Sequence, residues 1–361
     1  MVELATIGVV MNTSILKVNA QAPTGEELLP AVEVLRRGGL VAFPTETVYG
    51  LGADALDEKA AKKIYEAKGR PSDNPLIIHI AKMETLEELT VDIPKEAYDL
   101  ANAFWPGPLT MILKKSEKVP YGTTGGLDTV AIRMPSHKLA LKLIDESGLC
   151  IAAPSANSSG KPSPTLAKHV IDDLDGNIDM VIDAGKSVIG LESTIVDLTS
   201  DRPCILRPGY ITKSMIEKVI GAVDYDKVVM LKETDDSVKP KAPGMKYKHY
   251  APYGDLTIFE GEAINVVKRI NEEVEKAKAS GKSVGIIATD ETKGQYGSGL
   301  VKSIGTRQDD ETIASSLYAI LREFDTLKTE VIFSESFYDD QLGQAIMNRL
   351  IKASGYKIIK V

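Results

Sequence analysis

The chain has 361 residues, of which 43% are hydrophobic and 26% charged, a composition typical of a soluble globular protein, and its length favours two domains over one. Its net charge of −8 argues against a protein that coats nucleic acid through bulk positive charge, although it leaves room for a local basic groove. The chain has only two cysteines, which argues against a disulfide framework and a zinc ribbon. No apolar run approaches the ~18 residues of a membrane helix, and the first residues lack the basic segment of a signal peptide. We therefore expect a cytoplasmic protein.

Short apolar strands alternate with amphipathic helices between about residues 25 and 221. Residues 57–68 predict a helix, because apolar side chains recur on one face between Asp57, a suitable N-cap, and Gly69 at the end. Further helices are predicted at residues 94–105 and 136–148, the second capped by Ser136, and strands at residues 39–43, 76–80, 109–113, 129–134, 150–154, 179–184, 193–198 and 204–208. This alternation predicts an α/β domain with a mixed sheet.

The composition changes after about residue 232. Residues 232–254 are polar, contain three prolines and show no periodicity, which is typical of a linker. Order resumes with strands predicted at residues 256–260, 283–289 and 331–335 and helices at residues 262–281, 309–327 and 339–355. This β-α-β order predicts a small parallel sheet flanked by helices.

The first candidate site segment is the run PTETVYGLG at residues 44–52, which follows a strand that we expect to be buried. Strand ends are where α/β sheets place ligands, and the hydroxyls of Thr45 and Thr47 suit a small polar substrate. The alternative is a turn whose hydroxyls are satisfied locally.

The second segment is the end of the predicted helix, where Lys68 and Arg70 flank a glycine and Asn74 follows. A lysine point charge and an arginine fork can converge on a triphosphate. Two cations that only complement a helix C-terminus are the alternative. His79 lies on the next strand, where a lone histidine is more often a hydrogen-bonded core residue than a ligand.

Polar side chains also interrupt or follow the later strands, at Thr129, Arg133, Ser155, Asn157, Ser163, Thr194 and Arg207. An arginine within an apolar strand is costly to bury without a partner, so Arg133 and Arg207 indicate either buried carboxylates or anionic ligands.

The linker carries the run Lys246, Tyr247, Lys248, His249 and Tyr250. Cations interleaved with aromatic rings suit phosphates and a stacked base, and a solvated basic spacer is the alternative. Two Gly-Lys-Ser tripeptides lack the upstream glycine of a P-loop, so we expect no Walker loop. The pattern Gly50-x-Gly52-x-x-Ala55 matches a dinucleotide-binding turn only loosely.

Taken in order, the motifs PTETVYGLG, EAKGRPSDNPLIIH, DTVAIRMP, APSANSSGKPSPT, LESTIVD and LRPG resemble the signature of YrdC-like domains. The run PGMKYKHYAP and the α/β tail resemble the longer Sua5 form within the Sua5/YrdC/YwlC family of threonylcarbamoyl-AMP synthases, with Lys248 standing where the linker motif often has an arginine. The resemblance implies an α/β fold: a YrdC-like catalytic domain with a twisted mixed β-sheet and flanking helices (13–222), a linker that covers the active site (223–254) and a Rossmann-like parallel α/β Sua5 domain (255–361).

The family resemblance also implies a reaction, in which L-threonine, bicarbonate and ATP give threonylcarbamoyl-AMP and pyrophosphate for N6-threonylcarbamoyladenosine formation in tRNA. It implies that ATP is bound by Lys68, Arg70, Asn74, Thr129, Ser155, Asn157, Ser163, Arg207, Lys246, Tyr247 and His249. It implies that L-threonine is bound by Thr45, Thr47, His79, Arg133, Ala153 and Thr194. Lys68 and Arg70 are expected to stabilise the departing pyrophosphate, with Mg²⁺ held through the ATP phosphates and not by dedicated protein ligands. The expected partners are a downstream tRNA threonylcarbamoyl transferase complex and, weakly, tRNA or double-stranded RNA, with no membrane.

Three alternatives remain at this point. A YrdC-like module could bind double-stranded RNA or tRNA without catalysis. Carbamoyl transfer of the hydrogenase-maturation type would also need zinc-finger cysteines, and this chain has two cysteines in all. A nicotinamide oxidoreductase rests on the loose glycine pattern alone.

Overall fold

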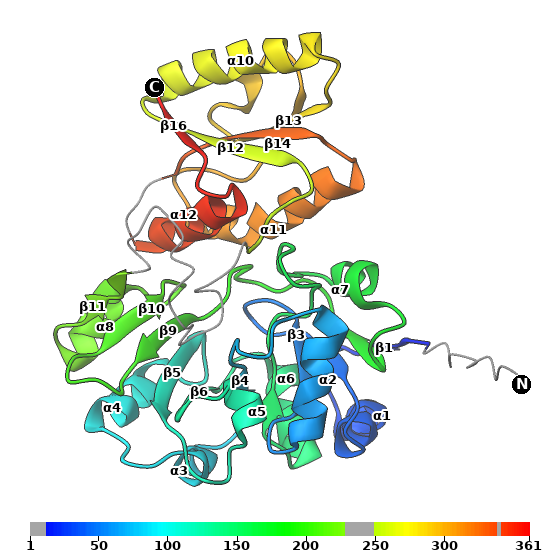
Figure 1. The fold of residues 1–361 in the computed structure, drawn as a ribbon, viewed down its shortest axis with the longest axis vertical. Coiled ribbons are helices and arrows are strands. Elements are labelled where there is room, and N and C mark those ends of the chain that lie inside the picture. Colours follow the sequence, from blue (N-terminus) through cyan, green and yellow to red (C-terminus); the bar gives the residue numbers. More distant parts are fainter. Residues whose placement is uncertain (1–11, 228–248, 338–340) are drawn as a thin grey trace, which may run out of the picture.

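The computed structural model describes residues 12–227, 249–337 and 341–361. Figure 1 shows two α/β units stacked along the long axis of the molecule, with the first described strand, β1, in the lower unit and the C-terminus in the upper one. Within the described ranges, no helix combines the length and the apolar character needed to cross a membrane.

The lower unit is built on an eleven-stranded sheet with the order β1-β8-β2-β3-β7-β4-β6-β5-β9-β10-β11. Its strands are β1 (Ser14–Lys17), β2 (Val41–Phe43), β3 (Gly50–Asp54), β4 (Ile77–His79), β5 (Leu109–Lys114), β6 (Thr129–Arg133), β7 (Ile151–Ala152), β8 (Met180–Asp183), β9 (Thr194–Asp197), β10 (Cys204–Arg207) and β11 (Asp224–Tyr225). Strand β5 pairs antiparallel with β6 and parallel with β9, so the sheet is mixed as predicted.

The helices of this unit are α1 (Gly25–Arg36), α2 (Glu58–Lys68), α3 (Glu84–Leu89), α4 (Lys95–Phe104), α5 (Tyr121–Thr124), α6 (Lys138–Ser147), α7 (Ala167–Leu174) and α8 (Lys213–Ile220). Helix α2 confirms its prediction, since the Asp57 side chain accepts a hydrogen bond from a first-turn amide and Gly69 ends the helix with a left-handed φ of 59°. The predicted Ser136 cap of α6 is wrong. His137 occupies the N-cap position and makes no side-chain cap bond, so Ser136 lies one residue outside the cap.

Strand β3 was not predicted, because its glycines suggested a turn. Gly50 and Gly52 lie in an extended strand that pairs antiparallel with β2 and β7. A Cβ atom on Gly52 would lie 2.7 Å from the Phe43 ring and 2.8 Å from the Ile151 side chain, so the close packing of these strands requires glycine there. The dinucleotide-binding interpretation of this pattern is therefore wrong.

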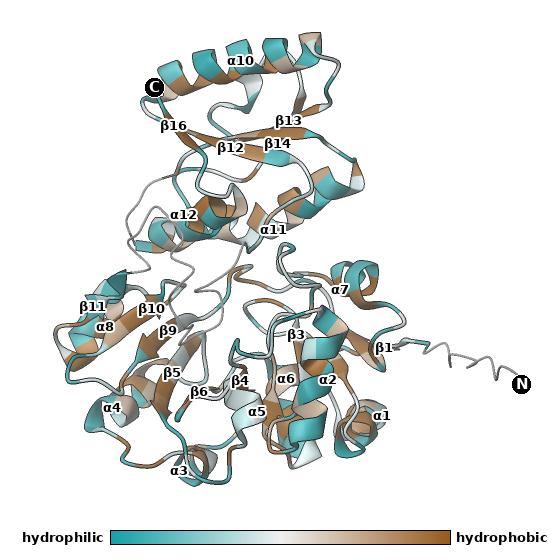
Figure 2. Ribbon diagram, in the orientation of Figure 1, coloured by the Kyte–Doolittle hydropathy of each residue, from teal (hydrophilic) through white to brown (hydrophobic). Residues whose placement is uncertain are grey.

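The upper unit holds a five-stranded sheet with the order β14-β13-β15-β12-β16, in which all pairs are parallel, as predicted. Its elements are β12 (Asp255–Glu260), α10 (Ala263–Ala279), β13 (Val284–Ala288), the 3-10 turn η1 (Lys293–Gln295), β14 (Leu300–Ser303), α11 (Asp310–Thr326), β15 (Val331–Glu335), α12 (Gln341–Ala353) and β16 (Ile358–Lys360). Helix α10 covers one face of the sheet, and α11 and α12 cover the other (Figure 1). The strands between these helices are largely hydrophobic (Figure 2).

Helices α11 and α12 also form the contact between the two units (Figure 1). One hydrophobic cluster includes Val48 and Leu191 of the lower unit together with Tyr250, Leu317 and Ile346. The two units therefore share buried apolar side chains, and the upper unit is packed against the segments that carry the predicted site motifs.

Candidate active site

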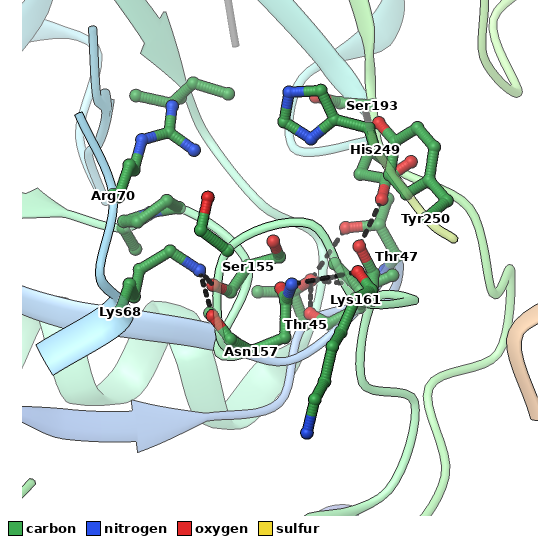
Figure 3. Close-up of a pocket in the computed structure, with 18 of the residues that line it drawn as sticks. Thr45, Thr47, Lys68, Arg70, Ser155, Asn157, Lys161, Ser193, His249 and Tyr250 are labelled. Carbon is green, nitrogen blue, oxygen red and sulfur yellow. Dashed lines mark hydrogen bonds between the residues drawn. The ribbon is translucent and has the colours of Figure 1, made fainter. Parts of the chain in front are cut away.

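A pocket with about 700 Å³ of empty space, its open mouth included, lies in the lower unit next to this contact (Figure 3). It brings together most of the predicted site residues, namely Thr45, Thr47, Lys68, Arg70, His79, Arg133, Ala153, Ser155, Asn157, Ser163, Arg207 and His249. These residues come from seven separate segments, so the sequence motifs converge on one site.

Three predicted residues are not part of the pocket lining. Thr129 begins β6, and the step of four positions from Thr129 to Arg133 spans about 13 Å of extended strand. The Thr194 hydroxyl donates to the carbonyl of Ile211 at 2.7 Å. Asn74 lies behind Arg70, whose Nη2 is 3.5 Å from the Asn74 carbonyl oxygen. Lys246 and Tyr247 lie outside the described residues.

The cationic side of the pocket is formed by the end of α2. Lys68 is the last residue of the helix, and its Nζ donates to the carbonyl oxygens of Ser155 and Asn157 at 2.5 Å each (Figure 3). Burial, with a further contribution from Arg70, holds the pKa of Lys68 well below its usual value. Burial also lowers the pKa of Arg70, to about 10. Within the described ranges neither cation has a carboxylate at ion-pair distance, so this side of the pocket suits an anionic ligand.

The opposite side is formed by the β2–β3 turn and the ends of β4 and β6. His79 and Arg133 are register partners in neighbouring parallel strands. Arg133 donates from Nη1 to the Thr47 hydroxyl at 3.0 Å, and its Nη2 lies 2.7 Å from Glu46 Oε1. Burial and then the charge of Arg133 lower the pKa of His79 to about 3, so the imidazole is neutral at physiological pH. This corner therefore presents a cation, hydroxyls and a neutral ring to a small polar molecule.

Sequence reasoning missed Glu46 as the partner of Arg133. The available signal was the arginine itself, since an arginine in an apolar strand requires a buried partner and Glu46 is the acidic residue within PTETVYGLG.

It also missed the role of Glu192, which lines the pocket and accepts a 2.5 Å hydrogen bond from Ser163 Oγ. Burial acts to raise the pKa of Glu192, but Arg349 and Arg207 outweigh it and lower the value to about 2. Arg207 donates from Nε to the Ser193 carbonyl at 3.0 Å and from Nη2 to the Ser193 hydroxyl at 3.1 Å. A carboxylate and an arginine are thereby fixed side by side in this wall.

The described end of the linker lies at the pocket. His249 and Tyr250 line it, and the amide of Ala251 donates to the Gly160 carbonyl at 2.9 Å. The Tyr250 ring is buried and stacks on Tyr318 of α11, with centroids 5.3 Å apart. In the part of the chain that is described, no group of three or more histidine, cysteine, aspartate or glutamate side chains is arranged to hold a metal ion.

Two family models together match most of the chain. The model described as "Telomere recombination" matches residues 33–209, and the model described as "Threonylcarbamoyl-AMP synthase, C-terminal domain" matches residues 211–355. The threonylcarbamoyl-AMP synthase of Pyrococcus abyssi is 54% identical over 92% of this chain and 95% of that protein. The chain belongs to the threonylcarbamoyl-AMP synthase family. The family member from Bacillus subtilis is 52% identical, and the match covers 92% of this chain and 94% of the B. subtilis protein.

A solved structure of a threonylcarbamoyl-AMP synthase family member, P. abyssi Sua5 complexed with L-threonine, superimposes with a TM-score of 0.91. The two sequences are 51% identical, and the superposition covers 97% of this chain and 100% of the P. abyssi chain. The predicted family and the predicted two-part α/β fold are confirmed.

Proposed function

We propose that this enzyme joins L-threonine, bicarbonate and ATP into threonylcarbamoyl-AMP, releasing pyrophosphate, and so supplies N6-threonylcarbamoyladenosine formation in tRNA. The observation that carries the proposal is that one pocket holds both an anion-binding side, with Lys68 and Arg70, and a small polar corner around Arg133. A relative at 51% identity has been solved with L-threonine, which supports threonine as the substrate of the polar corner.

In this proposal the threonine carboxylate pairs with Arg133, whose guanidinium already meets the Thr47 hydroxyl and Glu46. Thr45, Thr47, neutral His79 and the backbone of Ala153 complete the threonine site. The predicted Thr194 is left out, because its hydroxyl is bonded to the Ile211 carbonyl outside the pocket lining. A neutral His79 is favourable here because a second buried cation would compete with Arg133 for the same partners.

The nucleotide occupies the other side. Lys68, Arg70, Ser155, Asn157, Ser163, Arg207 and His249 of the pocket lining form the proposed ATP site. Asn74 and the linker residues Lys246 and Tyr247 remain predicted members of it, whereas Thr129 is left out because it lies away from the lining. Lys68 and Arg70 face the β- and γ-phosphates and stabilise the negative charge that develops on the departing pyrophosphate.

The chemistry needs positioning more than a nucleophilic side chain. The threonine amine bonds to the carbon of bicarbonate while a C–O bond of bicarbonate breaks, which gives a carbamate and one water. A carbamate oxygen then bonds to the α-phosphorus as the bond to the bridging oxygen of pyrophosphate breaks. Because the carbamate and the mixed anhydride are both labile, the protein must hold the reactants in line and exclude water. Residues 249–250 at the pocket suit that second task.

The residues present also fit Mg²⁺ bound through the ATP phosphates, which would neutralise phosphate charge. The Asn74 side-chain oxygen is buried and has no hydrogen-bond partner among the described residues, and the Asn74 backbone carbonyl lies 3.5 Å from Arg70 Nη2. A neutral amide oxygen is a hard donor of the kind Mg²⁺ accepts, so Asn74 would assist the metal–phosphate group from behind Arg70, while the ATP phosphates would hold the metal.

We place the reaction in the cytoplasm, since a chain with two cysteines needs no oxidising compartment. The labile adenylate must pass to a tRNA threonylcarbamoyl transferase complex, and weak tRNA or double-stranded RNA binding at the enzyme surface would assist that transfer.

The test is pyrophosphate release from ATP and Mg²⁺ with and without L-threonine and bicarbonate. We expect release that requires both, that is much weaker with L-serine, and that Arg70→Ala abolishes. A folded sample that binds tRNA but shows no threonine-dependent release would instead support the RNA-binding module, and full turnover by Arg70→Ala would remove that residue from the proposed role.

A further inference from the structure

Arg349 of α12 is the largest fully buried side chain among the described residues, and it reaches from the upper unit to Glu192, which lines the pocket. Its Nε donates to Glu192 Oε2 at 2.9 Å, and its Nη1 donates to the carbonyl of Pro208 at 2.6 Å, next to Arg207. Arg349 itself does not line the pocket, whereas Glu192 and Arg207 do. The upper unit thus contacts the site through residues that a ligand in the pocket could touch.

Tyr318 of α11 makes a second contact of this kind. Its hydroxyl lies 3.0 Å from Oε1 and 2.9 Å from Oε2 of Glu192, and its ring stacks on Tyr250. The Glu192 carboxylate therefore accepts hydrogen bonds from three side chains, Ser163 of the lower unit and Tyr318 and Arg349 of the upper unit.

We infer that Arg349 is a positioning residue for the nucleotide side of the active site, which it sets by holding the Glu192 carboxylate in its hydrogen bond with Ser163. The inference rests on the proposed function, because it assigns Ser163 and Arg207 to ATP. It gives the upper unit a part in substrate binding through side chains that the substrate does not touch.

Two arginines act on the charge of Glu192, and the effect of Arg349 is larger than that of Arg207. The groups that face the carboxylate are Arg349 and Lys352 from α12, Tyr318 from α11, Arg207 from β10, and Tyr250. The pKa of Glu192 is about 2 with Arg349 present, so the carboxylate is charged throughout the neutral range. Without Arg349 burial still acts to raise that pKa while Arg207 and Ser163 still lower it, so the carboxyl takes up its proton at a higher pH than in the wild type. A carboxyl that carries a proton has fewer acceptor lone pairs for Ser163 and Tyr318.

The experiment compares Arg349→Met and Arg349→Lys in the full chain, with Arg269→Met as the control, since Arg269 is a half-exposed α10 residue that pairs with Glu273. The KM values for ATP and L-threonine and the kcat are measured across pH 5.5–8.5. We expect Arg349→Met to raise the KM for ATP roughly tenfold or more, as loss of an outer-shell partner does at metal sites. The KM for threonine should change much less, and activity should fall on the acid side where the wild type is flat. Arg349→Lys should restore most of both properties.

An Arg349→Met protein that is folded and keeps the wild-type KM for ATP and a flat pH profile would overturn the inference. If that variant does not fold, Tyr318→Phe is the substitute, because it removes the hydroxyl and keeps the stacked ring. It should shift the KM for ATP in the same direction by a smaller factor, and no shift would also overturn the inference.

A second measurement, ATP affinity by calorimetry in the absence of threonine, distinguishes failure of the proposed function from failure of the positioning role. If the wild type binds ATP but shows no threonine-dependent release, the proposed reaction fails, while weaker binding by Arg349→Met still supports the positioning role. If the two proteins bind ATP equally well, the positioning role fails whatever the reaction.

Discussion

Substitution of Arg133 by glutamine should affect folding and threonine binding through two different partners. Arg133 and Glu46 form an ion pair at 2.7 Å, and their side chains are only 5% and 10% exposed. Removing one partner of such a pair leaves a buried charge, which typically costs about 3–5 kcal/mol of unfolding free energy. The lost charge-assisted hydrogen bond to the threonine carboxylate is worth about 1.5–3 kcal/mol, which is roughly a 10- to 150-fold increase in the KM for threonine.

The double variant Arg133→Gln, Glu46→Gln separates these effects. It contains no unpaired charge, so urea unfolding should recover most of the lost stability, while pyrophosphate-release assays should still show the raised KM for threonine. Lys114→Gln, which breaks the exposed pair with Asp92, serves as the control and should change neither quantity appreciably. A double variant with wild-type affinity for threonine would refute the assignment of Arg133 to the substrate carboxylate.

Three further outcomes are expected. Lys68→Met should lower the rate of threonine-dependent pyrophosphate release by about 10²–10³-fold, the loss typical of one transition-state donor, while Lys59→Met on the exposed face of α2 should not. The pKa of His79 is about 3 in the folded protein and 6.5 in an unperturbed histidine, so between these pH values the unfolded chain binds one proton more than the folded protein. The unfolding free energy should therefore fall as the pH drops from about 6.5 towards 3. His79→Leu should flatten this pH dependence in acid-unfolding curves, and an unchanged slope would contradict a neutral His79. Arg322→Met removes a buried partner of Asp173, which keeps Lys161 as its second partner. Urea unfolding should therefore show a loss of about 1.5–3 kcal/mol, the contribution of a hydrogen bond to a charged group, and an unchanged stability would contradict a buried pair there.

The sequence predicted best those features that depend on neighbours along the chain. Helix α2 and its Lys68-Gly69-Arg70 end follow from a cap, a periodic apolar face and a left-handed glycine, all of which are local. The parallel upper sheet followed from the order of its strands and helices.

The features that were missed depend on partners far away in the chain. Glu192 and Arg349 are separated by 157 residues and meet only because α12 packs on the lower unit. Strand β3 was missed because Gly50 and Gly52 have low strand propensity, and the need for them comes from Phe43 and Ile151 on neighbouring strands. Thr129 shares a strand face with Arg133, but spacing along a strand places it away from the pocket lining.

The apolar cluster that the two units share means that neither unit can be expressed alone without exposing buried side chains. A lower unit expressed alone would present Val48 and Leu191 to water, and the Glu192 carboxylate would lose Tyr318 and Arg349. Such a fragment would be prone to self-association through the uncovered patch, as exposed apolar surfaces generally are. A soluble truncated enzyme would therefore need polar replacements at Val48 and Leu191 together with a new cation beside Glu192. Removing the upper unit thus requires changes both on the surface and in the active site of the lower unit.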